Sequence, residues 1–180
     1  MMALDSIRPV PCPRLRSRRR ALLLGCALGT SLVVAAAPQR AGAQAFNANP
    51  ATDFGSVTYF RATPNVETVQ VESDTAVITW RPPPLPPGDT TFLFLPNGNT
   101  ATFVNGPNNS NYVVLNRIAT SLPSRFDGTV LGTIRDTSGN VAPGGTILFS
   151  SPGGIIAGAT SVFDVGNLVL TTLNVVVDGA

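Results

Sequence analysis

The reactive side chains of this sequence are carboxylates, arginines and hydroxyls, because the chain contains no histidine and no lysine. Both cysteines, Cys12 and Cys26, lie within the first 45 residues. In the remainder, the missing imidazole, thiol and amine groups exclude histidine-based triads, histidine metal ligands and thiol or amine nucleophiles. Paired carboxylates are the chemistry left to consider, since two of them suffice for glycoside cleavage.

Three aspartates are candidates for such a pair. Asp127 and Asp136 flank one expected strand, and Asp164 follows later in the chain. Aspartate also stabilises turns, because its carboxylate binds nearby backbone N–H groups, and we prefer that interpretation for all three. The D-x-D-x-D spacing of a calcium loop is absent from the sequence. We therefore predict no catalytic residue, no metal and no cofactor, and a protein that is not an enzyme.

The first 45 residues have the features of a signal peptide. Five arginines between residues 14 and 20 precede an apolar segment at Ala21–Ala37. Ala43-Gln44-Ala45 then matches an A-x-A cleavage site, so we predict that residues 1–45 are removed and that the mature chain starts at Phe46. The domain proper is then 46–180.

Two features of this leader fit other forms of export. Leu23-Leu24-Gly25-Cys26 resembles a lipoprotein box, but the apolar segment before Cys26 is shorter than the usual roughly 7–15 residues. Ser17-Arg18-Arg19-Arg20 loosely fits a twin-arginine signal. We favour general secretion, and the twin-arginine route stays open.

Removal of the leader reverses the charge of the protein. The whole chain has a formal net charge of +2, but seven of its twelve arginines lie at or before Arg40. Residues 46–180 keep five arginines against nine acidic side chains, a balance of −4. The basic character therefore belongs to the leader and does not indicate nucleic-acid binding.

The remaining chain consists of short segments rich in β-branched residues, separated by turns rich in Gly, Pro and Asn, which is typical of strands. No apolar i, i+3, i+4 pattern persists long enough to favour a helix. The five prolines of 81–89 predict a loop outside any sheet. The expected strands are 66–72, 75–80, 91–95, 100–104, 112–118, 129–134, 146–150, 155–156, 161–165, 168–173 and an apolar strand at 174–177.

These strands predict an all-β fold, and two architectures fit them. One is an antiparallel sandwich, and the other is a parallel β-helix with about six coils of about 20 residues each. The segment 46–58 is polar and small, and we expect it to form an N-terminal cap or an extended arm. Periodicity alone does not separate the two architectures.

The segment Gly144–Leu173 (GGTILFSSPGGIIAGATSVFDVGNLVLTTL) resembles the signature of the filamentous haemagglutinin N-terminal domain, the secretion domain of two-partner secretion exoproteins. Its part from Val162 to Leu173 is similar to the family's "VNVGGLVATTL"-like strand. The family's Asn-Pro-Asn-Gly-Ile turn corresponds here to Ser151-Pro152-Gly153-Gly154-Ile155, in which both asparagines are replaced. Asn116-Arg117-Ile118 resembles a second family element, and the resemblance covers roughly Val66–Leu173.

The resemblance implies a right-handed parallel β-helix with an N-terminal cap and small extra strand pairs. It also implies the function of a secretion and recognition domain in a filamentous haemagglutinin-like surface adhesin. Such a domain passes through the periplasm unfolded, where an outer-membrane transporter with periplasmic docking modules recognises it. The expected recognition residues are Ser151, Pro152, Gly153, Gly154, Ile155, Asn116 and Arg117.

Other functions remain open beside this one. A β-helical enzyme acting on polysaccharides needs a cleft with two carboxylates and an arginine, and an autotransporter passenger needs a C-terminal barrel. A host or cell-surface glycan or protein is a further candidate partner. Because exoproteins of the family usually continue after the signature strand, we expect the chain to be truncated at its C-terminal end.

Overall fold

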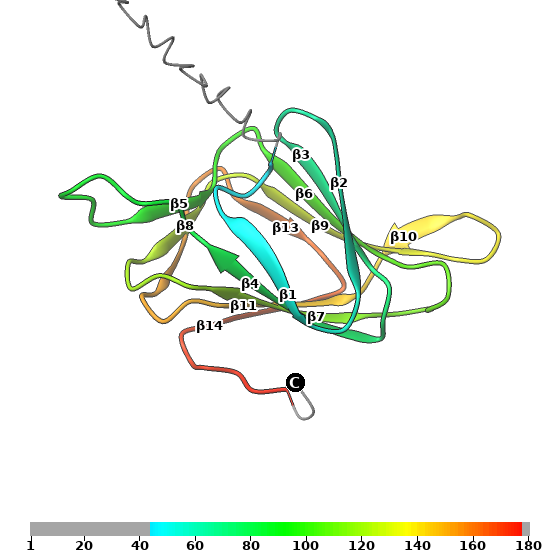
Figure 1. Cartoon of the computed structure of the whole chain (residues 1–180). Coiled ribbons are helices and arrows are strands. Elements are labelled where there is room, and N and C mark those ends of the chain that lie inside the picture. The colour runs from blue at the N-terminus through cyan, green and yellow to red at the C-terminus, as the bar shows by residue number, and fades with distance from the viewer. Residues whose placement is uncertain (1–43, 178–180) are drawn as a thin grey trace, which may run out of the picture. The chain divides into compact units, whose positions relative to one another are not determined.

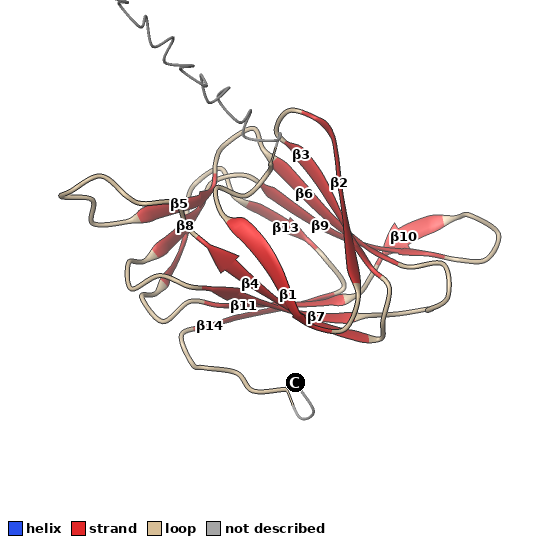
Figure 2. Cartoon of the chain, in the orientation of Figure 1, coloured by secondary structure: helices blue, strands red, loops and turns tan. Residues whose placement is uncertain are grey.

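The computed structural model describes residues 44–177, and all regular structure in them is β (Figures 1 and 2). None of the residues from 44 to 177 lies in a helix, so this part of the chain has no helix suited to crossing a membrane. The strands are β1 (Asn49–Phe54), β2 (Val57–Thr63), β3 (Val66–Val71), β4 (Thr75–Arg81), β5 (Phe92–Leu95), β6 (Thr100–Asn105), β7 (Val113–Ile118), β8 (Ser124–Phe126), β9 (Thr129–Arg135), β10 (Val141–Pro143), β11 (Thr146–Ser150), β12 (Ile155–Ala157), β13 (Val162–Asp164) and β14 (Asn167–Thr171). The predicted all-β class is confirmed.

The strands form three sheets. Sheet A has the order β1-β4-β7-β11-β14, sheet B has the order β10-β9-β6-β3-β2 with β13 also on β9, and sheet C has the order β12-β8-β5. From β3 onward the chain visits sheets B, A and C in turn and then repeats that order. Strands that follow each other within a sheet in this way pair in parallel. Each pass of the chain therefore lies alongside the previous one.

The register shows how long each pass is. Val66 on β3 pairs with Thr100 on β6, which pairs with Thr129 on β9, which pairs with Val162 on β13. These steps span 34, 29 and 33 residues of the chain. The expected length of about 20 residues was wrong, because the strands are joined by long loops such as 82–91, which leave the sheets.

Antiparallel strands cover one edge of sheets A and B. β1 pairs antiparallel with β4, and β2 pairs antiparallel with β3. The segment 46–58, expected as a cap or an arm, thus supplies β1 and the start of β2. This pairing matters because an uncovered strand edge exposes unpaired N–H and C=O groups. A third antiparallel strand, β10, pairs with the end of β9.

The core between the sheets is rich in aromatic rings. Six of these rings have no exposed surface at all: Phe46, Trp80, Phe94, Phe103, Phe126 and Phe149. Phe46 stacks on Phe94 with 4.5 Å between ring centroids, and Phe126 meets Phe149 edge-on at 5.0 Å. Burial of each large apolar side chain contributes about 1.5–3 kcal/mol. Trp80 thus belongs to this core.

The segment after β14 crosses sheet A without extending it. Arg117 donates from its guanidinium to the carbonyl of Val175 over 2.9 Å, and the Ser150 hydroxyl donates to the carbonyl of Leu173 over 2.6 Å. These bonds satisfy carbonyls that a further strand would have used. The expected strand at 174–177 was therefore wrong, since the structure has no strand there.

Candidate functional site

The structure places the strand that carries Asn116 and Arg117 beside the strand that leads into the turn Ser151–Ile155. Asn116 and Arg117 on β7 pair with Phe149 and Ser150 on β11, and Ser151 follows directly. The hydroxyls of Ser124 and Ser151 are 2.9 Å apart and form a hydrogen bond. Segments separated by more than thirty residues in the chain therefore meet at one corner, where sheet A passes into sheet C.

Asn116 points into the core. Its side chain is fully buried, and the Trp80 indole N–H donates to its Oδ1 over 2.9 Å. Its Nδ2 donates in turn to the carbonyl of Leu148 over 3.2 Å. A buried amide needs such partners, because each unpaired group loses its bonds to water without replacement. In the folded chain Asn116 therefore links three neighbouring strands, β4, β7 and β11.

Arg117 lies on the opposite face of β7. Its guanidinium donates to Val175 as described, and its Nη1 is 4.0 Å from the carboxylate of Asp53 on β1. An ion pair at this distance and exposure contributes little, about 0–1 kcal/mol. Arg117 thus contacts β1, at one edge of sheet A, and the segment that follows β14, the strand at the other edge.

The turn after β11 is built for tight packing. Ser151 is fully buried, its N–H donates to Thr171, and its carbonyl accepts from the Gly154 N–H over 3.0 Å. Gly154 has a φ of +112°, a conformation that favours glycine. At Gly153, a Cβ atom would lie 2.3 Å from the carbonyl oxygen of Leu122, so no side chain fits without a shift of the backbone.

Among these turn residues, Pro152 is the exposed one, and Gly153, Gly154 and Ile155 are half-buried. The Ser124 N–H donates to the carbonyl of Gly154 over 2.9 Å, so this turn lies directly on the preceding pass of the chain. The shape of the corner thus depends on residue types that the sequence reasoning singled out.

Only part of the predicted cleavage site lies within the residues that the structure describes. Ala43 lies outside the described residues. Ala45 and Phe46 lie inside them, and both are fully buried.

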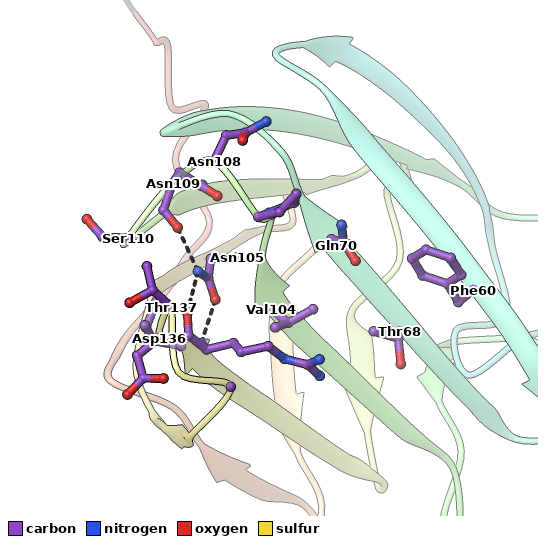
Figure 3. Close-up of a pocket in the computed structure, with 15 residues that line it drawn as sticks. Phe60, Thr68, Gln70, Val104, Asn105, Asn108, Asn109, Ser110, Asp136 and Thr137 are labelled. Carbon is purple, nitrogen blue, oxygen red and sulfur yellow. Dashed lines mark hydrogen bonds between the residues drawn. The ribbon is translucent and has the colours of Figure 1, made fainter.

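A second feature is a groove of about 1110 Å³ on the face of sheet B that points away from the core (Figure 3). Thr68 and Gln70 contribute to it from β3, where they alternate with the buried Val69 and Val71. Phe60 lies at one end of the groove and is 49% exposed. The groove therefore combines an accessible aromatic ring with amide and hydroxyl groups.

The far end of the groove is held together by Asn105. Its Oδ1 accepts from the Arg135 N–H over 2.6 Å, and its Nδ2 donates to the carbonyls of Arg135 and Asn109. One side chain thus joins β6, the loop that follows it and the end of β9. Figure 3 shows Asn108, Asn109 and Ser110 beside it.

The neighbouring hairpin is closed by Asp136. Its carboxylate accepts from the Asn140 side chain and from the backbone N–H groups of Asn140 and Ser138 over 2.8–2.9 Å. These bonds, that of the Asn140 side chain first, hold the pKa of Asp136 below its usual value. The preference for a turn aspartate at this position is confirmed.

The other two aspartates occupy different places. Asp127 accepts from Arg125 Nε over 2.8 Å, and Asp164 is the last residue of β13. Within residues 44–177, no group of three or more acidic, histidine or cysteine side chains is placed to hold a metal ion.

The residues of the groove were not singled out in the sequence. The signal that could have indicated them is the cluster of amides from Asn105 to Asn109, which we interpreted only as a turn. Phe60 gives a weaker signal, because its strand carries no clear alternation.

No model of a known protein family matches the chain, and no curated protein matches it.

Proposed function

We propose that the domain is a right-handed parallel β-helix of the kind that serves as the N-terminal secretion domain of two-partner secretion exoproteins. The support for this architecture is the repeated order of sheets B, A and C with parallel pairing between successive passes. β1 and β2 serve as its N-terminal cap, and β10 with the end of β9 forms the strand pair outside the helix. The handedness comes from the family resemblance.

The proposed function is export, through the periplasm and across the outer membrane, by a partner transporter with periplasmic docking modules. The observation that carries it is the parallel pairing of β7, which carries Asn116 and Arg117, with β11, the strand of the signature segment that leads into the turn Ser151–Ile155. Segments that resemble a family signature and also contact each other in space support one shared role more strongly than either segment alone.

Because two of these residues are buried, a partner can contact their side chains only before the domain folds. Asn116 and Ser151 are fully buried in the folded chain. A transporter module that contacts their side chains must therefore bind before folding, when the segments are extended. Extended segments commonly bind by adding a strand to an exposed sheet edge. The lack of cysteine after residue 45 suits this route, because no disulfide loop obstructs passage.

The test is surface display of the epitope-tagged full chain in its native host, followed by fractionation of the cells. We expect Gly153→Val combined with Gly154→Val to abolish display while the periplasmic amount is retained. The matched control is Gly88→Val combined with Gly139→Val, at glycines of positive φ with open space around them. Unchanged display of the first variant would reject the recognition role. Retention of the wild-type chain in the cytoplasm would reject export itself.

A second candidate function is the binding of a neutral glycan in the groove on sheet B. Phe60 offers an exposed ring, and Gln70, Asn105 and Asn108 carry amides, which provide both donors and acceptors. Arg135 and Asp136 line the groove with opposite charges, which favours a ligand without net charge.

Calorimetric titration of the purified protein with cellohexaose and chitohexaose tests this second function. Phe60→Ala should weaken binding at least tenfold. Val162→Ala is the matched control, since Val162 has the same exposure on β13 and lies outside the groove. Absence of heat with both sugars, or equal binding by the two variants, would refute it.

A further inference from the structure

The first described residues belong to the core rather than to a tail. Ala45 and Phe46 are both fully buried. The Ala45 N–H donates to Glu67 Oε2 over 3.2 Å, and the Ala45 carbonyl accepts from Asn99 Nδ2 over 2.8 Å. The next residue, Asn47, donates its N–H to Phe94 over 2.8 Å. Both backbone groups of Ala45 are therefore used inside the fold.

The partners of Ala45 are themselves buried polar groups. Glu67 is fully buried on β3, and its other oxygen, Oε1, accepts from Arg61 Nε over 2.8 Å. Asn99 is also buried. A chain that started at Phe46 would leave the Asn99 amide without this acceptor and would remove one of the donors to the Glu67 carboxylate. Buried polar groups left in this way destabilise a fold.

A start at Phe46 would also place a charged ammonium group on a residue whose side chain lies among buried rings. Phe46 contacts Trp80, Phe94 and Phe149 with centroid distances of 4.6, 4.5 and 6.2 Å. An ammonium group in such surroundings needs a carboxylate as its partner.

We infer that the leader is cleaved after Ala43, so that the mature chain begins at Gln44 and keeps Ala45. Ala41-Gly42-Ala43 satisfies the same A-x-A rule as the site two residues later. Both sites therefore satisfy the rule, and the contacts of Ala45 favour the earlier one. This inference rests on the proposed export and replaces the expected start at Phe46.

The experiment determines the N-terminal residue of the exported full chain by Edman sequencing and intact mass. We expect Gln44. Ala41→Asp removes the small residue required at the first position of Ala41-Gly42-Ala43 and leaves the later site intact, so chains that begin at Gln44 should be lost, replaced by uncleaved precursor or by chains that begin at Phe46. Gly42→Asp is the matched control, because the middle position of the motif tolerates any side chain, and it should be cleaved like the wild type.

The outcomes separate this inference from the function on which it rests. A wild-type chain that begins at Phe46, with normal cleavage of Ala41→Asp, would overturn the inference and leave export intact. A wild-type chain that keeps its leader would overturn the proposed export.

Discussion

Asn116→Leu separates the structural role of this residue from any role in recognition. The substitution keeps a side chain of similar size but removes the amide that accepts from Trp80 and donates to Leu148. The Trp80 indole N–H is then buried without a partner, since Trp80 is fully buried.

The expected loss follows from these two bonds. An unpaired buried donor costs about 1–3 kcal/mol, and the lost bond to Leu148 adds about 0.5–1.5 kcal/mol. The larger apolar surface of leucine offsets part of this, about 1–2 kcal/mol. We therefore expect the free energy of unfolding to fall by about 1–3 kcal/mol. In a domain of this size that corresponds to a drop in Tm of roughly 4 °C per kcal/mol.

Urea unfolding followed by circular dichroism measures this loss, and a double-mutant cycle with Trp80→Phe identifies its source. Phenylalanine has no N–H to leave unpaired, so Asn116→Leu should cost about 1–2 kcal/mol less in that background. The control is Asn167→Leu on β14, an exposed position, which should change stability by less than about 0.5 kcal/mol. Equal losses in the wild-type and Trp80→Phe backgrounds would refute the reasoning.

Two further predictions concern the corner turn and alkaline pH. Gly153→Ala should lower the urea midpoint more than Gly88→Ala, because the new Cβ at position 153 meets the Leu122 carbonyl while Gly88 has open space around it. This order is expected although Gly88, and not Gly153, has a positive φ. Equal midpoints would contradict the packing argument. Burial raises the pKa of Tyr112, whose hydroxyl donates to Phe103 over 3.1 Å. The unfolded chain therefore loses this proton first, and stability should fall as the pH rises above about 10, the ordinary tyrosine value. Tyr112→Phe should flatten that decline, and an unchanged pH profile of Tm would count against this assignment.

Most strands from Val66 onward were predictable because each has a hydrophobic pattern and is bounded by turn residues. The pairing of those strands was not, since the same pattern suits an antiparallel sandwich. β8 (SRF) and β10 (VAP) were not predicted, because three-residue segments that contain an arginine or a proline show no clear strand pattern. β1 was expected only as a cap or arm, because its residues are polar and its role is to cover an edge.

Within the predicted strands, the burial of the charged residue Glu67 was the least expected feature. The strand VETVQV places Val69 and Val71 inward, so the period of two also brings Glu67 into the core and leaves Val66 exposed. Hydrophobicity alone would reverse the two. The inward position is stable because Arg61 and the Ala45 N–H come from elsewhere in the chain, which local sequence does not reveal.

The corner residues of the candidate site were found by resemblance, and their contacts explain the residue types. Gly153 is required because the Leu122 carbonyl leaves no room for a side chain, and Gly154 suits its positive φ. Asn116 supplies the acceptor for the indole N–H of Trp80. The groove on sheet B could not be predicted from the sequence, because its residues come from four strands and two loops that only the fold brings together.

The place of Phe46 has a consequence for a chain that emerges vectorially from a pore. Its ring packs against Phe149, more than a hundred residues later, as well as against Phe94 and Phe103 in between. If the domain is exported through a transporter as proposed, this hydrophobic centre can close only after that distant ring has also left the pore. On that route the core around Phe46 would be completed late, through contacts of very long sequence separation.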